Sequence, residues 1–265
     1  NSLYDQTSAN IKITTAEGVT LNQSDVDQIT RYAHVTKDLS IDIKDAKIGA
    51  GINLDFVMCY SLKSISLPNS LTSIADNAFY NCSSLTSVVI PNSVTSIGGF
   101  AFYFCTGLTS VVIPDSVTSI NKGAFPRCSG LTSITVSVDN PNYKSIDGVL
   151  FNKDGSSIIA YPGGKSGVYT IPSSVISIGD YAFFGCSGLT SVVIPNSVTS
   201  IGSESFRYCT VLTSIVIPNG VTSIEMMAFS DCTGLTSVTI NAVIPPSLSH
   251  NIFYNTNTAL QIKVP

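Results

Sequence analysis

The pattern of hydrophobic and polar positions repeats every 23 residues over most of the chain. The clearest marker is a proline that recurs at this interval, at Pro68, Pro91 and Pro114 and then at Pro172, Pro195 and Pro218. In the unit from Leu85 to Cys105, a β-rich segment ends at Pro91. Alternation places Val88 and Ile90 on one face of this segment. The pattern therefore predicts a short strand with one buried face, followed by a turn.

The rest of each unit also carries a regular apolar pattern. After the turn, Val94 and Ile97 return to the core, and Ala101, Phe102 and Cys105 have the spacing of a short helical turn. Such a unit cannot bury its apolar face alone, so we expect neighbouring units to stack with their strands about 4.8 Å apart. The sequence predicts a predominantly β solenoid: a right-handed stack of 23-residue repeats, with a parallel sheet on one side and short helical turns on the other.

All seven cysteines occupy one position of the repeat, three residues after a phenylalanine: Cys59, Cys82, Cys105, Cys128, Cys186, Cys209 and Cys232. Stacking would bring successive cysteine Cα atoms within disulfide range. Their Cβ atoms would be parallel and about 4.8 Å apart, beyond the usual separation of about 3.8 Å. Because a free cysteine behaves as a small hydrophobe, we interpret the seven as structural core thiols. Disulfides and a reactive site are the less favoured alternatives.

The repeat also carries a family resemblance. Leu-x-x-Val-x-Ile, then Asn-x-Val, then Ile-x-x-x-Ala-Phe-x-x-Cys-x-x-Leu resembles a leucine-rich repeat. More closely, Ile-Pro-Asn-Ser-Val-Thr-Ser-Ile-Gly with Ala-Phe-x-x-Cys is similar to the BspA-like bacterial leucine-rich repeat surface proteins, over about residues 39–265. The resemblance implies a leucine-rich-repeat solenoid, a secreted or cell-surface location, and binding to host matrix proteins or other cells.

Two segments depart from the regular repeat. Residues 1–38 are rich in charge and predict a polar N-terminal cap with one helix at about 24–35, for which Ser24 is the expected N-cap. Residues 39–265 then form the solenoid. A 35-residue unit interrupts it at about 137–171, with a predicted hairpin of strands 148–152 and 157–161. We interpret this long repeat as a structural spacer; a functional protrusion and a metal site are the alternatives.

Composition argues against a membrane-spanning protein and against a nucleic-acid-binding protein. Mean hydropathy is +0.34 and only 11% of residues are charged, yet no apolar run approaches the about 20 residues that a membrane-spanning helix needs. We therefore expect no transmembrane segment. A net charge of −4 argues against a nucleic-acid partner. Because the chain starts at Asn1, we expect a mature or trimmed fragment whose export signal and anchor lie outside it.

The search for catalytic chemistry finds little. The two histidines, His34 and His250, are expected near opposite ends of the repeat array, and the sequence has no Cys-x-x-Cys motif and no phosphate-binding glycine loop. Paired carboxylates for acid–base work are not evident. We therefore expect no catalytic residues, no cofactor and no metal site.

Two surfaces remain as binding candidates. The predicted strand face carries small uncharged side chains: Ser87, Val89, Ser110, Val112, Ser133, Thr135, Ser191, Val193, Ser214, Val216, Ser237 and Thr239. Its simplest interpretation is a filler that keeps the sheet regular and soluble. Aromatic and arginine side chains fall beside the Phe-Cys pairs on the turn side: Tyr80, Phe100, Tyr103, Phe104, Tyr181, Phe184, Arg207 and Tyr208. These residue types serve protein and sugar contacts, although packing between neighbouring turns also explains them.

The sequence and its resemblance together predict a non-enzymatic, extracellular or cell-surface module for protein interaction and adhesion, with a host matrix or cell-surface protein as partner. A glycan-binding accessory protein is one alternative, because aromatic platforms suit sugars. A structural spacer that presents another domain is the second alternative.

Overall fold

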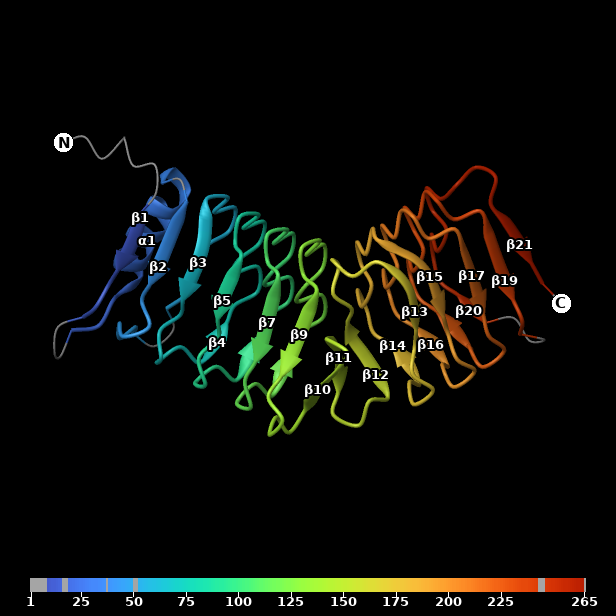
Figure 1. Cartoon of the computed structure of the whole chain (residues 1–265), viewed down its shortest axis with the longest axis horizontal. Coiled ribbons are helices and arrows are strands. Elements are labelled where there is room, and N and C mark those ends of the chain that lie inside the picture. The colour runs from blue at the N-terminus through green and yellow to red at the C-terminus, as the bar shows by residue number, and fades with distance from the viewer. Residues whose placement is uncertain (1–8, 16–18, 37, 50–51, 243–245, 265) are drawn as a thin grey trace. The chain divides into compact units, whose positions relative to one another are not determined.

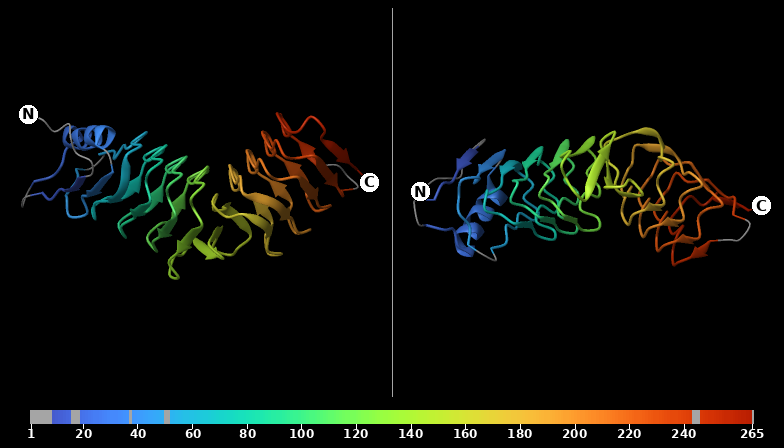
Figure 2. Two further views of the ribbon diagram at one scale, coloured as in Figure 1. Left: turned by 45° about the horizontal axis from the view of Figure 1, so that its top comes forward. Right: turned by 90° about the horizontal axis from the view of Figure 1, so that it is seen from below.

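The computed structural model describes residues 9–15, 19–36, 38–49, 52–242 and 246–264. The chain forms two compact units, Asn1–Asn142 and Tyr143–Pro265. Each unit is a stack of similar rungs whose short strands lie side by side (Figures 1 and 2). The boundary between the units falls inside the long repeat that the sequence indicates at 137–171. Among the described residues one helix is present, α1 (Gln23–Val35), at the start of the first unit.

The first unit is built on parallel strands. One sheet contains, in spatial order, β1 (Ala9–Lys12), β2 (Leu39–Asp42), β3 (Leu62–Ser66) and β5 (Ser87–Val89). Farther along the stack, β7 (Ser110–Ile113) pairs with β9 (Ser133–Val136). A second, narrower sheet contains β4 (Ser73–Ile74), β6 (Ser96–Ile97) and β8 (Ser119–Ile120). Neighbouring strands keep the 23-residue register, so that Ser64 pairs with Ser87 and Ser110 with Ser133.

The second unit starts with the long repeat. There β10 (Tyr143–Ile146), β11 (Val149–Asn152) and β12 (Ser157–Ala160) form an antiparallel meander. The predicted hairpin, β11 with β12, is confirmed, and β10 adds a hairpin that the sequence analysis did not include. Asp147 and Gly148 connect β10 to β11 with φ of 50° and 77°, which a two-residue turn between twisted strands requires.

Regular rungs follow in the second unit. β12 continues in parallel order with β14 (Ser177–Ile178), β16 (Ser200–Ile201), β18 (Ser223–Ile224) and β20 (Ser247–Leu248). On the other side, β13 (Gly167–Thr170) pairs with β15 (Leu189–Val193), and β17 (Ser214–Ile217), β19 (Ser237–Ile240) and β21 (Gln261–Lys263) form a further parallel sheet. The parallel-sheet solenoid predicted from the repeat is thus confirmed.

The cap region differs from the prediction in two ways. Helix α1 is capped by Asn22, because its side chain accepts a hydrogen bond from the Asp25 N–H (3.2 Å) and the Asp25 carboxylate accepts one from the Asn22 N–H (2.9 Å). The prediction of Ser24 as N-cap is wrong, because this reciprocal pair starts the helix earlier. Strand β1 was also not predicted. It extends the first sheet by pairing with β2.

The predicted helical turns are instead a series of tight turns, which we call the arc of each rung: the segment from the short second strand to the cysteine, residues 97–105 in one rung. The Cys105 N–H donates to the Phe102 carbonyl within the rung (3.3 Å), whereas the Phe102 N–H donates to Ala124 of the next rung (2.9 Å). Phe100 and Phe104 have left-handed φ of 54° and 60°. Because a left-handed residue interrupts a right-handed helix, no helix propagates through the arc.

The core of both units contains a ladder of stacked phenylalanines. In the first unit the ring centroids of Phe56, Phe79, Phe102 and Phe125 follow each other at 5.5, 5.2 and 5.4 Å. In the second unit the ladder contains Phe183, Phe206, Phe229 and Phe253. Tyr161 of the long repeat stacks on Phe183 at 4.9 Å. The long repeat therefore supplies an aromatic ring at the position where regular rungs supply phenylalanine.

The cysteines lie beside this ladder and are all buried, without disulfides. Their thiols bridge rungs: the Cys105 Sγ donates to the Phe79 carbonyl at 3.0 Å. The same bond joins Cys82 to Phe56, Cys128 to Phe102, Cys209 to Phe183 and Cys232 to Phe206. Burial raises the pKa of the Cys128 and Cys232 thiols to about 12.

We predict that the seven thiols react slowly in the folded protein. A thiol must ionise to attack a disulfide reagent. Burial raises the pKa of six of the thiols, and the seventh, Cys186, is buried at the same repeat position. Titration with an aromatic disulfide at pH 8 should label none of them rapidly, and all seven after denaturation in guanidinium. Rapid labelling of several cysteines in the native protein would contradict the buried ladder.

At the end of the first unit, the side chain of Asn140 is fully buried and covers two carbonyl groups. Its Nδ2 donates to the Pro114 carbonyl at 2.6 Å and to the Val117 carbonyl at 2.9 Å, and its Oδ1 accepts from the Asn142 N–H at 2.9 Å. Buried polar groups need such partners. Asn140 therefore supplies a donor to the Val117 carbonyl and a second donor to the Pro114 carbonyl, which also accepts from the Val117 N–H.

We predict that Asn140→Leu lowers the free energy of unfolding by about 3 kcal/mol, because it removes both donors from buried carbonyls. Asn142→Leu is the control: its exposed side chain makes one bond, to the Thr118 carbonyl, and should contribute about 1 kcal/mol. Urea unfolding followed by circular dichroism measures both. Equal losses in the two variants would show that Asn140 has no special role.

Candidate functional site

The strand face of the first unit consists of Ser87, Val89, Ser110, Val112, Ser133 and Thr135, and none of these side chains is charged. Its two valines are strongly exposed, at 62% for Val89 and 61% for Val112. Val112 pairs in register with Thr135. The face is therefore a flat surface on which rows of serine hydroxyls alternate with β-branched side chains.

The second unit has an equivalent strand face, made of Ser191, Val193, Ser214, Val216, Ser237 and Thr239. Val193 and Val216 are exposed by 50% and 48%. In register beside Val193 and Ser191 lie Thr170 and Val168 of the long repeat, and Val168 is exposed too. The sequence analysis did not include Val168, because the long repeat breaks the spacing on which the prediction relied.

On the arcs of the first unit, the structure brings the predicted aromatic residues together. Tyr80 and Tyr103 stack with centroids 4.8 Å apart, and Phe100 meets Tyr103 edge-on at 6.0 Å. Phe104 lies beside Tyr103, and the Arg127 guanidinium lies 5.8 Å from the Phe104 ring centroid. All four aromatic side chains are partly exposed. The sequence analysis missed Arg127, which occupies the position of Phe104 in the next rung.

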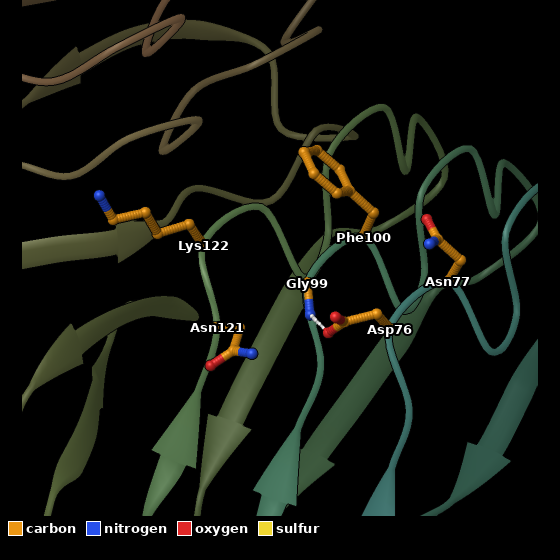
Figure 3. A pocket seen from close by; sticks show the side chains of 6 residues that line it. All are labelled: Asp76, Asn77, Gly99, Phe100, Asn121 and Lys122. Carbon is orange, nitrogen blue, oxygen red and sulfur yellow. Dashed lines mark hydrogen bonds between the residues drawn. The ribbon is translucent and has the colours of Figure 1, made fainter. Parts of the chain in front are cut away.

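Next to these aromatics is a hollow of about 450 Å³, which we call the arc hollow. It is lined by Asp76, Asn77, Gly99, Phe100, Asn121 and Lys122 (Figure 3). Gly99 occupies the repeat position at which the neighbouring rungs carry Asp76 and Lys122. The Asp76 carboxylate accepts a hydrogen bond from the Gly99 N–H at 2.6 Å. The hollow was not predicted from the sequence, although the pair Gly98-Gly99 was a readable signal, because Gly99 has Asp76 and Lys122 at the same position of the neighbouring rungs.

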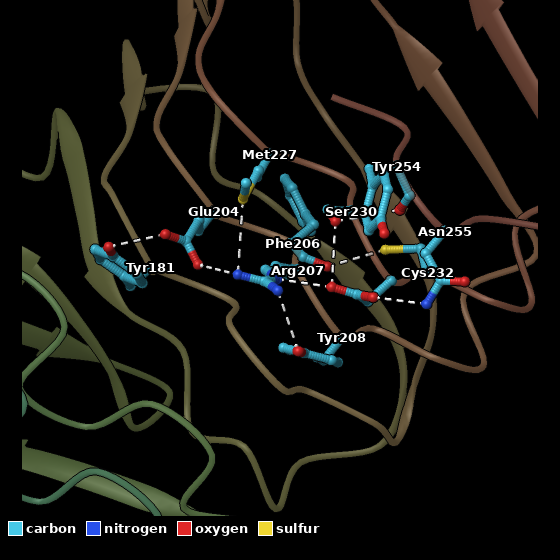
Figure 4. Close-up of polar contacts among 11 residues, drawn as sticks. Tyr181, Glu204, Phe206, Arg207, Tyr208, Met227, Ser230, Cys232, Tyr254 and Asn255 are labelled. Atoms are coloured by element: carbon cyan, nitrogen blue, oxygen red, sulfur yellow. Dashed lines mark hydrogen bonds and ion pairs between the residues drawn. The ribbon is translucent and has the colours of Figure 1, made fainter. Parts of the chain in front are cut away.

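The arcs of the second unit carry ion pairs in equivalent positions (Figure 4). The Arg207 guanidinium donates to Asp231 at 2.7 Å, to Glu204 at 2.9 Å and to the Tyr208 hydroxyl at 3.1 Å. The Tyr181 hydroxyl donates to Glu204 at 3.0 Å. Three of the predicted turn-side residues are thus part of one network. Tyr181 and Arg207 both bind Glu204, and Arg207 also binds Asp231 and Tyr208.

Phe184 corrects the expectation of a surface aromatic. It is only 6% exposed, and it packs edge-on against Tyr208 at 5.4 Å. The glycine that follows it, Gly185, takes the left-handed φ of 73° at a position that carries Asn81 and Phe104 in the first unit. Phe184 therefore contributes to packing between rungs, which was the alternative interpretation of the turn-side aromatics.

Charge and burial fix the ionisation of this ion-pair cluster. Burial alone would raise the pKa of the Asp231 carboxyl, but hydrogen bonds from Asn255 and Arg207 outweigh it and hold this pKa below its usual value. Burial, reinforced by the bond to Glu204, raises the pKa of Tyr181 to about 12. At neutral pH the Asp231 carboxylate is therefore ionised beside the Arg207 guanidinium, and the Tyr181 hydroxyl is neutral.

Histidine and cysteine meet at one place, where the His34 Nε2 of helix α1 lies 3.7 Å from the Cys59 Sγ. Burial, with a contribution from the Asp55 carboxylate, raises the pKa of Cys59 to about 12. The thiolate that a nucleophile requires is therefore not populated at neutral pH. Within the described parts of the chain, no three histidine, cysteine or acidic side chains gather as metal ligands would.

The stacked rungs and their repeat define a leucine-rich-repeat protein. The chain belongs to the family described as BspA type leucine rich repeat region, whose model matches residues 53–166 and 168–265 with six copies. No curated protein matches the chain. None of the helices in the described ranges is long and apolar enough to cross a membrane.

Several solved structures are similar. The pneumococcal vaccine antigen PcpA is 22% identical, with a TM-score of 0.62 over 86% of this chain and 68% of that chain. A leucine rich cell surface protein from Faecalibacterium prausnitzii is 25% identical, with a TM-score of 0.60 over 96% and 87%. A leucine-rich repeat protein from Eubacterium ventriosum is 23% identical, with a TM-score of 0.53 over 87% and 85%. The fold is thus one that presents extended surfaces to partners.

We predict that Asp231→Asn reduces the acid sensitivity of the protein. A carboxyl with a lowered pKa in the folded state stabilises the fold above its unfolded pKa, and this contribution is lost as the pH falls through the folded pKa. The variant should lose about 1–3 kcal/mol at pH 7, because a charged hydrogen bond is removed. It should lose less further stability than the original protein between pH 4 and pH 2.

Urea unfolding at pH 7, 4, 3 and 2 measures this difference. The control is Glu225→Gln in the same unit, because Glu225 is exposed and should change stability by less than about 0.5 kcal/mol. An Asp231→Asn variant with the pH profile of the original protein would contradict the role of this ion pair.

Proposed function

We propose that the protein is a non-enzymatic module for protein interaction and adhesion, located at the cell surface or secreted, which binds a host matrix or cell-surface protein. The observation that carries this proposal is the row of exposed valines on each strand face. Single exposed apolar residues are ordinary, whereas a contiguous apolar row is typical of a contact surface. Val89 and Val112 are exposed at the same repeat position of the successive strands β5 and β7, and Val193 and Val216 at that of β15 and β17.

The composition of the strand faces supports this choice of partner. A protein surface meets a flat sheet through shape and through neutral hydrogen bonds, and rows of serine hydroxyls offer both donors and acceptors. None of the twelve residues that define the two strand faces is charged, so burying them adds no desolvation penalty for ions, whereas Lys263 lies in register beside Thr239 at the end of the second face. The cell-surface protein from Faecalibacterium prausnitzii, at 25% identity, supports the proposed location.

The chemistry of the described residues supports the non-enzymatic part of the proposal. The most reactive side chains, the cysteines, are buried with raised pKa values or lie within the core. The ion pairs around Arg207 satisfy one another. The features that distinguish the described surface are therefore features of recognition.

We predict that lysine on the strand face weakens partner binding. The double variant Val89→Lys/Val112→Lys places two charges in the apolar row and should reduce the affinity for a bound matrix protein by about tenfold or more. Immobilised fibronectin, laminin and collagen are the probes, and surface plasmon resonance gives the affinities. Val193→Lys/Val216→Lys applies the same test to the second unit.

The matched control is Val138→Lys, because Val138 is highly exposed but lies after β9, outside the strand face. This variant should bind as the original protein does, and all variants should keep the circular dichroism of the fold. If none of the three matrix proteins binds, or if the double variants bind unchanged, the strand face is not the adhesive surface.

A further inference from the structure

We propose that the arc hollow of the first unit binds one pyranose ring of a neutral glycan. The hollow is lined by residues of three successive arcs: Asp76 and Asn77, then Gly99 and Phe100, then Asn121 and Lys122. It lies on the arcs and not on the strand face. The proposal therefore stands apart from the proposed protein-binding function, and either can fail without the other.

The hollow exists because Gly99 lacks a side chain. At Gly98 the fold requires glycine, because a Cβ would lie 2.4 Å from the Asp76 backbone nitrogen. At Gly99 it does not, because the nearest atom to a Cβ would be the Lys122 carbonyl oxygen at an ordinary 3.4 Å. Side chains as large as Lys122 and Met226 occupy the same repeat position in other rungs. The space at Gly99 is therefore not a requirement of folding.

The size of the space suits a small ligand. Its volume of about 450 Å³ falls in the range of roughly 300–1,000 Å³ that ligand pockets have. Figure 3 shows the Phe100 ring above Gly99, the Asp76 carboxylate at the same level as Gly99, and Lys122 on the opposite side. The lining thus combines one aromatic side chain, Phe100, with two amides and two charged side chains.

The lining combines polar groups with an aromatic ring, and a sugar likewise combines hydroxyl groups with an apolar C–H face. The two amides, Asn77 and Asn121, each offer donors and an acceptor, and the Asp76 carboxylate offers acceptors, so neighbouring hydroxyl groups of a pyranose can be met from both sides. The bond from the Gly99 N–H holds one Asp76 oxygen in place at 2.6 Å. The face of Phe100 suits the apolar C–H face of the ring.

Charge favours a neutral ligand over an ionic one. Asp76 and Lys122 carry opposite charges and occur in the same lining, so their fields largely cancel for a ligand between them. An anionic or cationic ligand would find one attractive and one repulsive partner. A neutral sugar meets no such repulsion and can donate a hydrogen bond to the Asp76 carboxylate.

The surroundings favour a chain of sugars over a single one. A second hollow of about 210 Å³ is lined by Tyr80, Asn81, Tyr103, Phe104 and Arg127. The edge-on contact of Phe100 with Tyr103, at 6.0 Å, joins the two hollows. A second ring could therefore stack on this aromatic group while the first occupies the arc hollow, which is the arrangement of an oligosaccharide site.

The second unit provides an internal comparison. There the position of Gly99 is held by Ser203 and that of Phe100 by Glu204. The Glu204 carboxylate accepts hydrogen bonds from the Arg207 guanidinium at 2.9 Å and from the Tyr181 hydroxyl at 3.0 Å (Figure 4). The Glu204 carboxylate is therefore held by side chains of its own and the preceding rung, whereas the Asp76 carboxylate is held by the Gly99 N–H and lines a hollow.

The experiment measures binding of neutral oligosaccharides to the whole chain. The probes are the hexasaccharides of β-1,4-glucose, α-1,4-glucose, β-1,3-glucose, β-1,4-mannose and β-1,4-N-acetylglucosamine, titrated by isothermal calorimetry. Gly99→Met fills the hollow with a side chain that the same position carries as Met226. Phe100→Asn removes the aromatic wall with the residue that this position carries as Asn77. Because both residues already occur in this fold, neither change should prevent folding.

We expect at least one hexasaccharide to bind the original protein, and each of the two variants to weaken it by about tenfold or more, the value of one good aromatic or pocket contact. Ser203→Met, the same change in the second unit, should bind as the original does. Three results would overturn the proposal: no binding of any probe, binding that neither variant changes, or loss of matrix-protein binding in Phe100→Asn without any sugar binding. The last result would assign the hollow to a protein interface.

Discussion

Each rung of this protein must satisfy the polar groups of the rung before it, and most of the structure depends on this constraint. Backbone strands meet part of the requirement, and side chains that recur every 23 residues meet the rest. The Thr95 hydroxyl donates to the Thr72 carbonyl at 3.1 Å, and the Thr118 hydroxyl to Thr95 at 3.3 Å. The cysteine thiols do the same inside the core. Short hydroxyl and thiol donors thus replace the charged side chains that are scarce in this sequence.

Much of the fold follows from local spacing, because burial in a stack depends mainly on the position within the repeat. The alternation in strand β5 and the common position of all seven cysteines predicted which side chains face the core. The N-cap residue of helix α1 was harder to predict, because Asn22 and Ser24 are both good capping residues and the reciprocal hydrogen bonds with Asp25 decide between them. The arcs resemble helix in their spacing, but their left-handed residues and rung-to-rung bonds become visible only in three dimensions.

The surface sites were harder to predict, because they depend on residues one repeat apart. Arg207 pairs with Asp231, 24 residues away, and nothing in the neighbourhood of either residue signals that pair. The sequence analysis identified Phe100 and Tyr103 by type alone. Phe100 lines a hollow with Asp76 and Lys122 because three successive arcs place Asp76, Gly99 and Lys122 at the same repeat position. The strand faces were predictable in composition, since period-two alternation determines which side chains point outward.

Fifteen described residues other than glycine have a left-handed backbone, and most of them lie on the arcs. Glycine or asparagine adopts this conformation readily, whereas a bulkier residue such as Phe100 or Tyr208 is strained by about 1 kcal/mol or more. The bulky left-handed residues of the arcs therefore lower the stability of the protein. Because the core residues of each rung supply its packing, glycine or asparagine at these outer positions should raise stability without changing the core.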